Sequence, residues 1–196
     1  MVQRIAEKYQ IGSHTMTHQL VWQQSKAELR APGFSIRESE GWAYEILNEL
    51  GIKYDCSVFP ATHAHGGLPS YPKAAPGIID YKGIQMKEFP VSFKTIAGKH
   101  IIYSGGGYFR LFPYSLIKMW SKQSPNYLMA YIHPRDLDAG QPMLEGLPAT
   151  RKFKSYVGLK GAESKLRKYL SEFEFTDIAT ASEGIDWGKA PRVRLG

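Results

Sequence analysis

The sequence predicts an α/β domain in which helices alternate with the strands of a parallel sheet or barrel. Two observations indicate this class. A helix pattern, a glycine and a strand pattern follow one another over residues 36–58, and an unbroken apolar run at residues 127–132 has the length of a strand buried on both faces. The chain has 196 residues, 43% of them hydrophobic and 22% charged, which is enough for one domain with a sizeable core.

The first predicted element is a helix over residues 36–50. Ser35 and Glu38 have the spacing of a capping box, and four apolar side chains fall on one helix face: Trp42, Ile46, Leu47 and Leu50. Gly51 stands where a helix end favours a residue free to take a positive φ, and residues 52–58 follow as a strand.

Residues 60–83 contain eight prolines and glycines, which predict a long loop. Beyond it the pattern predicts strands at 88–93, 100–103 and 127–132, helices at 114–121 and 163–173, and a loose tail over 181–196.

Charge and cysteine content narrow the classes of protein. The formal net charge is +7, and residues 151–170 hold seven basic side chains against the single acid Glu163. A solvated helix face and a polyanion-binding module both fit this segment, whereas no nucleic-acid-binding signature accompanies it.

The lone Cys56 excludes an internal disulfide and a cysteine-rich metal site. No apolar run reaches the ~18 residues of a membrane span, and residues 1–8 are charged where a signal peptide is apolar, so we expect a cytoplasmic chain.

Three places carry residues suited to chemistry. His14 and His18 are four residues apart, which on a helical turn brings both imidazoles near one divalent ion, although catalytic zinc sites usually have three protein ligands. His133 ends the predicted strand 127–132, where chemistry gathers in α/β folds, although a strand-end histidine can also be a structural hydrogen-bonding group. Arg30 precedes a rigid Ala-Pro-Gly turn and could face a carboxylate or simply solvent.

In their order along the chain, these segments resemble the polysaccharide deacetylase family with the NodB homology domain. The likeness is greatest to the branch associated with exopolysaccharide and cell-surface polysaccharide synthesis. It covers residues 4–178 and rests on segments 14–18, 30–35, 54–57, 104–113, 131–136, 138–142 and 151–159.

The resemblance implies a distorted, incomplete (β/α) barrel over residues 1–180 that holds one divalent metal, most often zinc. The family binds its metal through an aspartate and two histidines, and the histidines correspond to His14 and His18. A metal-bound water attacks the acetamide carbonyl after giving its proton to an aspartate base. By the same likeness His133 is the general acid, Arg30 holds the base, and Asp55 orients His133.

The glycine-rich segment of the family corresponds to the predicted substrate-binding residues Gly106, Gly107, Tyr108 and Arg110. The expected partner is an N-acetylated polysaccharide or glycan precursor, with no nucleic acid and no membrane span. The sequence does not indicate an oligomeric state.

Two departures from the family pattern leave the alternatives open. Residues 1–13 contain no aspartate to act as base and third metal ligand, and only eleven residues join His18 to Arg30, too few for the helix and strand that the family places there. We therefore expect a metal-dependent hydrolase that removes N-acetyl or similar acyl groups. The alternative is a truncated, inactive member that binds carbohydrate.

Overall fold

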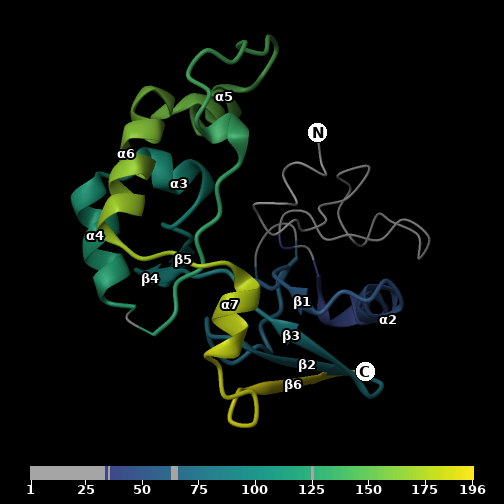
Figure 1. The fold of residues 1–196 in the computed structure, drawn as a ribbon. Coiled ribbons are helices and arrows are strands. Elements are labelled where there is room, and N and C mark those ends of the chain that lie inside the picture. Colours follow the sequence, from purple (N-terminus) through teal and green to yellow (C-terminus); the bar gives the residue numbers. More distant parts are fainter. Residues whose placement is uncertain (1–33, 35, 63–65, 125) are drawn as a thin grey trace. The chain divides into compact units, whose positions relative to one another are not determined.

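The fold is described here from a computed structural model, which covers residue 34 and residues 36–62, 66–124 and 126–196. It is a mixed α/β structure with two compact units (Figure 1). Unit 1 combines the described residues up to Pro90 with Thr176–Gly196, and unit 2 is Val91–Phe175.

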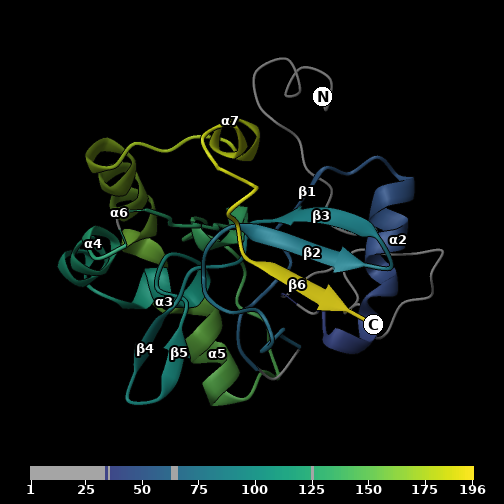
Figure 2. The same ribbon diagram turned by 90° about the horizontal axis from the view of Figure 1, so that it is seen from below.

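Unit 1 is built on a four-stranded mixed sheet in the order β1-β3-β2-β6. The strands are β1 (Tyr54–Asp55), β2 (Gly77–Tyr81), β3 (Ile84–Glu88) and β6 (Arg192–Leu195). β1 is parallel to β3, β2 is antiparallel to β3, and β6 is parallel to β2. Figure 2 shows β3, β2 and β6 side by side.

Strand β2 lies inside the segment that the sequence predicts to be a loop, and it forms a hairpin with β3. Two residues connect them, Lys82 at φ +51° and Gly83 at φ +85°. Positive φ at both positions is typical of the tight turn that matches the twist of an antiparallel pair. The prolines and glycines of residues 60–83 concealed this hairpin, and the strand predicted at 88–93 ends at Glu88 instead.

One helix layer of unit 1 comprises the short 3₁₀ helix η4 (Glu38–Glu40) and α2 (Trp42–Glu49), which confirms the helix predicted there. Gly51 has the positive φ expected of it, +70°. The buried face differs in part from the prediction, because Leu50 is 65% exposed while Ala43 and Tyr44 are buried. The core joins them to side chains from the strands and their connections: Ile36, Val58, Leu68, Tyr71, Ile79, Met86, Val193 and Leu195.

Unit 1 also contains α7 (Ile178–Glu183), whose first turn is capped by the Asp177 carboxylate accepting from the Thr180 N–H. The sequence predicts a loose tail over residues 181–196, and the structure differs there. The last four residues before Gly196 form β6, with Val193 and Leu195 in the core. Pairing with β2 orders this segment, and local sequence does not encode that pairing.

Unit 2 consists of a hairpin and a group of helices. The hairpin is β4 (Lys94–Ile96) and β5 (Lys99–Ile101), and the helices are α3 (Gly106–Leu111), α4 (Tyr114–Lys122), the 3₁₀ helix η5 (Pro134–Asp136), α5 (Ala149–Tyr156) and α6 (Leu159–Glu172). The predictions of α4 and α6 are confirmed. Their packing against α3 forms a separate core of Tyr103, Phe109, Ile117, Trp120 and Tyr169.

The prediction of a buried strand at residues 127–132 is wrong. This segment is half-buried, and among the described residues it forms only an isolated parallel bridge, between Tyr131 and Gly105. An apolar run of this length carries no periodicity that distinguishes a strand from other buried chain, and a strand needs a continuous partner.

The α/β class is confirmed, but the two sheets of the described residues are open and do not close into a barrel. Among the described helices, none combines the length and apolar character that crossing a membrane requires.

Candidate functional site

The candidate site in unit 2 centres on His133, which stands at the N-terminal cap of η5. Pro134 occupies the first helical position, where its fixed φ favours the turn. Asp136 closes the turn, because its Oδ2 accepts from the His133 backbone N–H at 3.1 Å and its own N–H donates to the His133 carbonyl at 2.8 Å. The His133 side chain is 47% exposed. The local sequence therefore holds a half-exposed imidazole on a constrained backbone.

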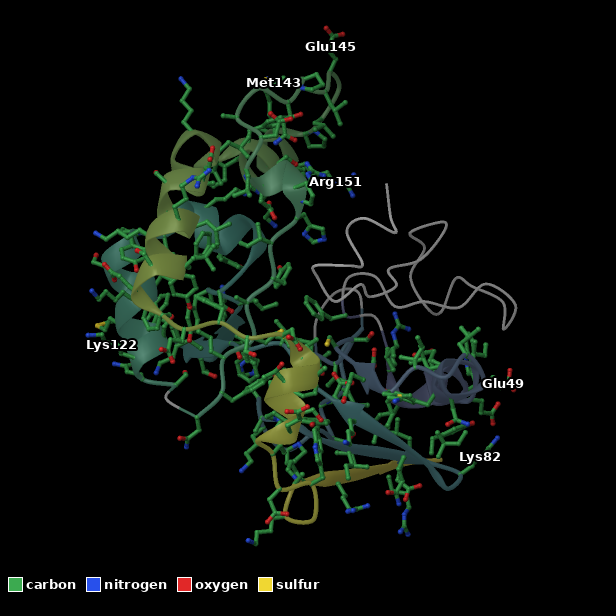
Figure 3. All side chains as sticks on the ribbon, viewed as in Figure 1. Glu49, Lys82, Lys122, Met143, Glu145 and Arg151 are labelled. Atoms are coloured by element: carbon green, nitrogen blue, oxygen red, sulfur yellow. The ribbon has the colours of Figure 1, made fainter. Side chains whose placement is uncertain are left out.

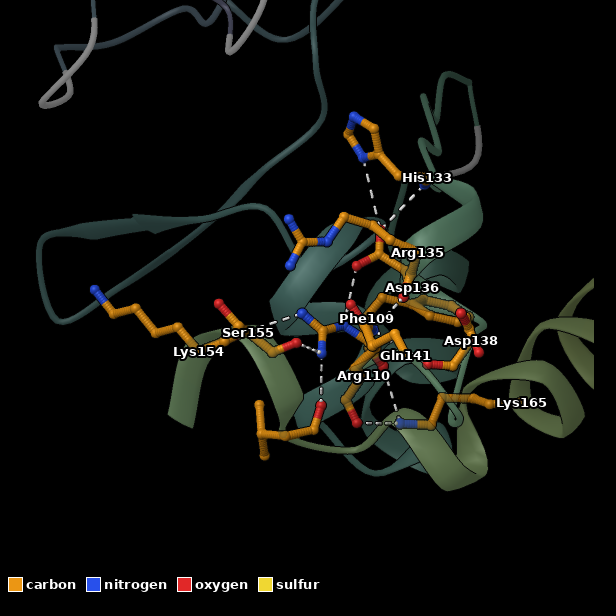
Figure 4. Close-up of polar contacts among 11 residues, drawn as sticks. Phe109, Arg110, His133, Arg135, Asp136, Asp138, Gln141, Lys154, Ser155 and Lys165 are labelled. Atoms are coloured by element: carbon orange, nitrogen blue, oxygen red, sulfur yellow. Dashed lines mark hydrogen bonds and ion pairs between the residues drawn. The ribbon is translucent and has the colours of Figure 1, made fainter. Parts of the chain in front are cut away.

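A buried carboxylate lies beside this imidazole. Asp136 Oδ2 is 3.6 Å from His133 Nδ1, and Oδ1 of the same carboxylate is 3.0 Å from Arg110 Nε. The Asp136 side chain is only 7% exposed. Figure 4 shows that the second ring nitrogen of His133 faces away from Asp136. The arrangement presents one imidazole nitrogen to the carboxylate and the other outward.

Arg110, from α3, anchors the carboxylate to the rest of unit 2. Its guanidinium donates to three backbone carbonyls: those of Ser155 (2.9 Å), Val157 (2.9 Å) and Lys154 (3.0 Å). The sequence predicts Arg110 as a substrate-binding residue, whereas the structure places its buried guanidinium against Asp136 and the end of α5. Arg110 thus holds Asp136 in place through a network inside the protein (Figure 4).

The glycines before α3 permit a close approach by Tyr131. A Cβ at Gly105 would lie 2.3 Å from the Tyr131 ring, and one at Gly106 would lie 2.8 Å from its hydroxyl. The Tyr131 ring in turn meets the His133 ring edge-on, with 5.8 Å between centroids. Burial, reinforced by the Asp136 charge, raises the pKa of Tyr131 to about 12, so its hydroxyl stays protonated at neutral pH.

Tyr108 presents an aromatic surface on α3. It is 44% exposed, and its ring stacks on Phe112 at 5.8 Å with an interplanar angle of 10°. A Cβ added at the neighbouring Gly107 would make an ordinary van der Waals contact with the Lys154 carbonyl oxygen. Of the predicted substrate-binding residues, Tyr108 is the one whose side chain offers a surface to solvent.

Unit 1 contains a second group of titratable residues, at the ends of the parallel strands β1 and β3. Asp55 and Glu88 are direct partners in the sheet register, and both side chains are buried. Asp55 Oδ1 accepts from Ser57 Oγ at 2.7 Å, and Glu88 Oε1 accepts from the Val58 N–H at 3.0 Å. Among the described residues, no hydrogen-bond partner is found for the other oxygen of each carboxylate.

Asp55 and Glu88 interact electrostatically in the folded protein. Burial raises the pKa of both carboxyls, and the Asp55 charge raises that of Glu88 further. The buried Tyr44 hydroxyl lies near enough for both carboxylates to add to the rise in its pKa, which burial dominates. The folded structure therefore disfavours ionisation of both carboxyls.

The predicted catalytic and metal-binding residues fall into two groups. His14, His18 and Arg30 lie outside the described residues. Asp55 belongs to unit 1 and His133 to unit 2, and the predicted pairing between them stays a prediction. The carboxylate next to His133 within unit 2 is Asp136, which sequence reasoning missed. The sequence did contain a signal for this pairing, because Asp136 follows His133 by three residues, at the third position of a turn that begins with Pro134.

The described residues contain no group of three or more His, Cys, Asp or Glu side chains that could hold a metal ion. Cys56 is a half-buried thiol, and burial raises its pKa, so it is not an activated nucleophile.

A family model described as a domain of unknown function (DUF3473) matches residues 56–183. No curated protein and no solved structure matches the chain. The matched segment includes Glu88, the glycine-rich start of α3, and the whole of the His133–Asp136–Arg110 network.

Proposed function

Because the chain belongs to the family described as a domain of unknown function (DUF3473), we propose its function from its own residues. We propose a metal-dependent amide hydrolase that removes N-acetyl groups from a polysaccharide or glycan precursor during cell-surface polysaccharide synthesis. The observation that carries the proposal is the half-exposed imidazole of His133 beside the buried carboxylate of Asp136. The sequence likeness to polysaccharide deacetylases, with their incomplete (β/α) barrel, supplies the reaction class.

In this proposal His133 is the general acid. Amide hydrolysis requires a proton on the departing nitrogen, and an imidazolium is suited to donate it near neutral pH. Asp136 faces Nδ1, so it stabilises the charged ring and directs the opposite nitrogen toward the leaving amine. Arg110 keeps the carboxylate from turning away, which makes Asp136 and Arg110 positioning residues.

The proposed metal would be held by His14 and His18. A divalent ion there would act as a Lewis acid toward the amide carbonyl, and zinc suits imidazole ligands. Tyr108 would provide a stacking surface for a sugar ring, because Phe112 supports one face of its ring. Arg30 would hold the base in place, and Asp55 would orient His133.

Acetate release from N-acetylglucosamine oligomers, with zinc supplied to the full chain, tests the proposal. We expect His133→Gln to lower kcat by about 100-fold or more, the usual contribution of a general acid. Asp136→Asn should lower kcat by at least about tenfold with little change in KM, because it leaves His133 present but wrongly oriented.

His100→Gln is the matched control, because His100 is an exposed histidine of the same unit whose Nδ1 contacts Thr95 Oγ1 on the neighbouring strand. Unchanged turnover is expected for it. Wild-type turnover that survives His133→Gln would overturn the assignment of the acid.

A second candidate function is carbohydrate binding without catalysis. The exposed ring of Tyr108, which is stacked on Phe112, favours this function because an aromatic face can bind a sugar ring without any catalysis. Oligosaccharide binding that Tyr108→Ala abolishes, with no acetate release at any zinc concentration, would establish this function in place of the first.

A further inference from the structure

Residues 138–148 and helix α5 of unit 2 expose large apolar side chains. Met143 is 56% exposed, Leu144 60% and Phe153 57%. Helix α5 has no buried residue along its length. Neither the proposed catalysis nor the packing of unit 2 accounts for this exposure.

The loop carrying Met143 and Leu144 is held in place by hydrogen bonds. The Tyr156 hydroxyl accepts from the Leu144 N–H at 2.8 Å and donates to the Pro142 carbonyl at 3.0 Å. Gln141 Nε2 donates to the Arg135 carbonyl at 2.8 Å. These bonds tie the apolar tip to α5 on one side and to η5 on the other.

Exposed basic side chains lie close in sequence to the apolar ones. Arg151, Lys152 and Lys154 are exposed on α5, and Lys160 is exposed at the start of α6. Residues 142–160 contain one acidic residue, Glu145, so this stretch carries a net charge of +3. Figure 3 shows Met143 and Glu145 on the loop and Arg151 on α5.

The surface is fixed to the candidate site. Arg110 binds the carbonyls of Lys154 and Ser155 at the end of α5 and the carboxylate of Asp136 beside His133. One guanidinium therefore links the exposed helix to the turn that carries the imidazole.

We propose that the loop–α5 surface, formed by Met143, Leu144, Arg151, Lys152, Phe153 and Lys154, docks on an anionic lipid membrane. Apolar side chains that enter the interface, together with cations that meet lipid phosphates, are the combination by which peripheral proteins bind bilayers. A soluble polyanion would use the cations alone and leave three large apolar side chains in water. This inference does not depend on the proposed hydrolase activity.

Co-sedimentation of the full chain with vesicles tests the proposal, using equimolar phosphatidylcholine and phosphatidylglycerol against phosphatidylcholine alone. We expect binding to the anionic vesicles that falls with salt. Arg151→Glu with Lys152→Glu should weaken it by at least about tenfold, since each cation near an anionic surface contributes to affinity. Met143→Ser with Leu144→Ser should also weaken vesicle binding, although this pair of substitutions leaves the charge of the protein unchanged.

Matched control pairs come from elsewhere on the chain. Lys53→Glu with Lys73→Glu makes the same charge change at exposed positions of unit 1. Leu50→Ser with Met119→Ser removes one leucine and one methionine of comparable exposure. Both control pairs should retain vesicle binding, and circular dichroism should show all variants folded.

Two outcomes would overturn the proposal. In the first, Met143→Ser with Leu144→Ser leaves vesicle binding unchanged and dextran sulfate displaces the protein from the vesicles; the surface would then be a polyanion-binding site. In the second, the protein does not bind vesicles, and the wild type is a dimer that the same pair of substitutions dissociates; the surface would then be a contact between two copies of the chain.

Discussion

At the scale of single residues, the most consequential feature is that two carboxyl side chains are buried in the interior of unit 1. Asp55 and Glu88 lie side by side at the ends of β1 and β3, each with one oxygen satisfied by a neighbouring donor. Burying a carboxylate is costly, and burial accordingly raises the pKa of both carboxyls.

The raised pKa of Glu88 makes the stability of unit 1 depend on pH. In the unfolded chain Glu88 releases its proton near its ordinary pKa of about 4.3, whereas in the folded chain its pKa is raised. The stabilisation is fully present below the unfolded value and is lost as pH rises through the folded value. Glu88→Gln, which keeps a donor at every pH, should raise the free energy of unfolding at pH 8 by about 1–3 kcal/mol.

Urea unfolding of the wild type and of Glu88→Gln across pH 4–9 measures this effect. The control is Glu45→Gln, a surface carboxylate of the same unit that pairs with Lys82. It should change stability by less than about 1 kcal/mol at every pH. Parallel pH profiles for the wild type and Glu88→Gln would show that folding does not raise the pKa of Glu88.

At the scale of secondary-structure elements, the two hairpins depend on the same kind of turn. Ala97 and Gly98 connect β4 and β5 with φ of +48° and +75°, as Lys82 and Gly83 connect β2 and β3. In each unit a glycine occupies the second position of a two-residue turn, where a side chain would be strained. The hairpins therefore owe their register to backbone conformation as much as to packing.

Gly83→Ala isolates that backbone contribution, because a Cβ at Gly83 would meet nothing within 4 Å. We expect a loss of about 1–2 kcal/mol in the free energy of unfolding, the cost of placing an L side chain in the left-handed region. The matched substitution is Gly161→Ala on α6, also without neighbours within 4 Å but at an ordinary helical position. It should stabilise by about 0.5–1 kcal/mol, and a loss of equal size there would refute the explanation.

At the scale of the whole molecule, the chain leaves unit 1 at Pro90 and returns to it at Thr176. Strand β6 pairs with β2 more than 110 residues after it in the sequence, with Val193 beside Ile79. Unit 2 has its own buried core between these points. Two cores imply two sets of contacts that can be weakened separately.

Hydrogen exchange on paired core variants tests this independence. Ile79→Ala should cost about 2–4 kcal/mol and lower protection in β2, β3 and β6 more than in α4 and α6. Ile117→Ala, an equally buried isoleucine of α4, should produce the reverse pattern. Equal loss of protection in both units from either variant would mean that they unfold as one.

The sequence by itself determined the helices α2, α4 and α6, the α/β class and His133 as a candidate, because helical periodicity and capping are local properties. Only the tertiary structure decided the hairpin of β2 and β3, the strand β6, and the irregular course of residues 127–132, because strand pairing depends on distant partners. The roles of Asp136 and Glu88 likewise depend on the residues that the fold places next to them. A carboxylate near His133 in sequence becomes its partner because Arg110, from another helix, holds it there.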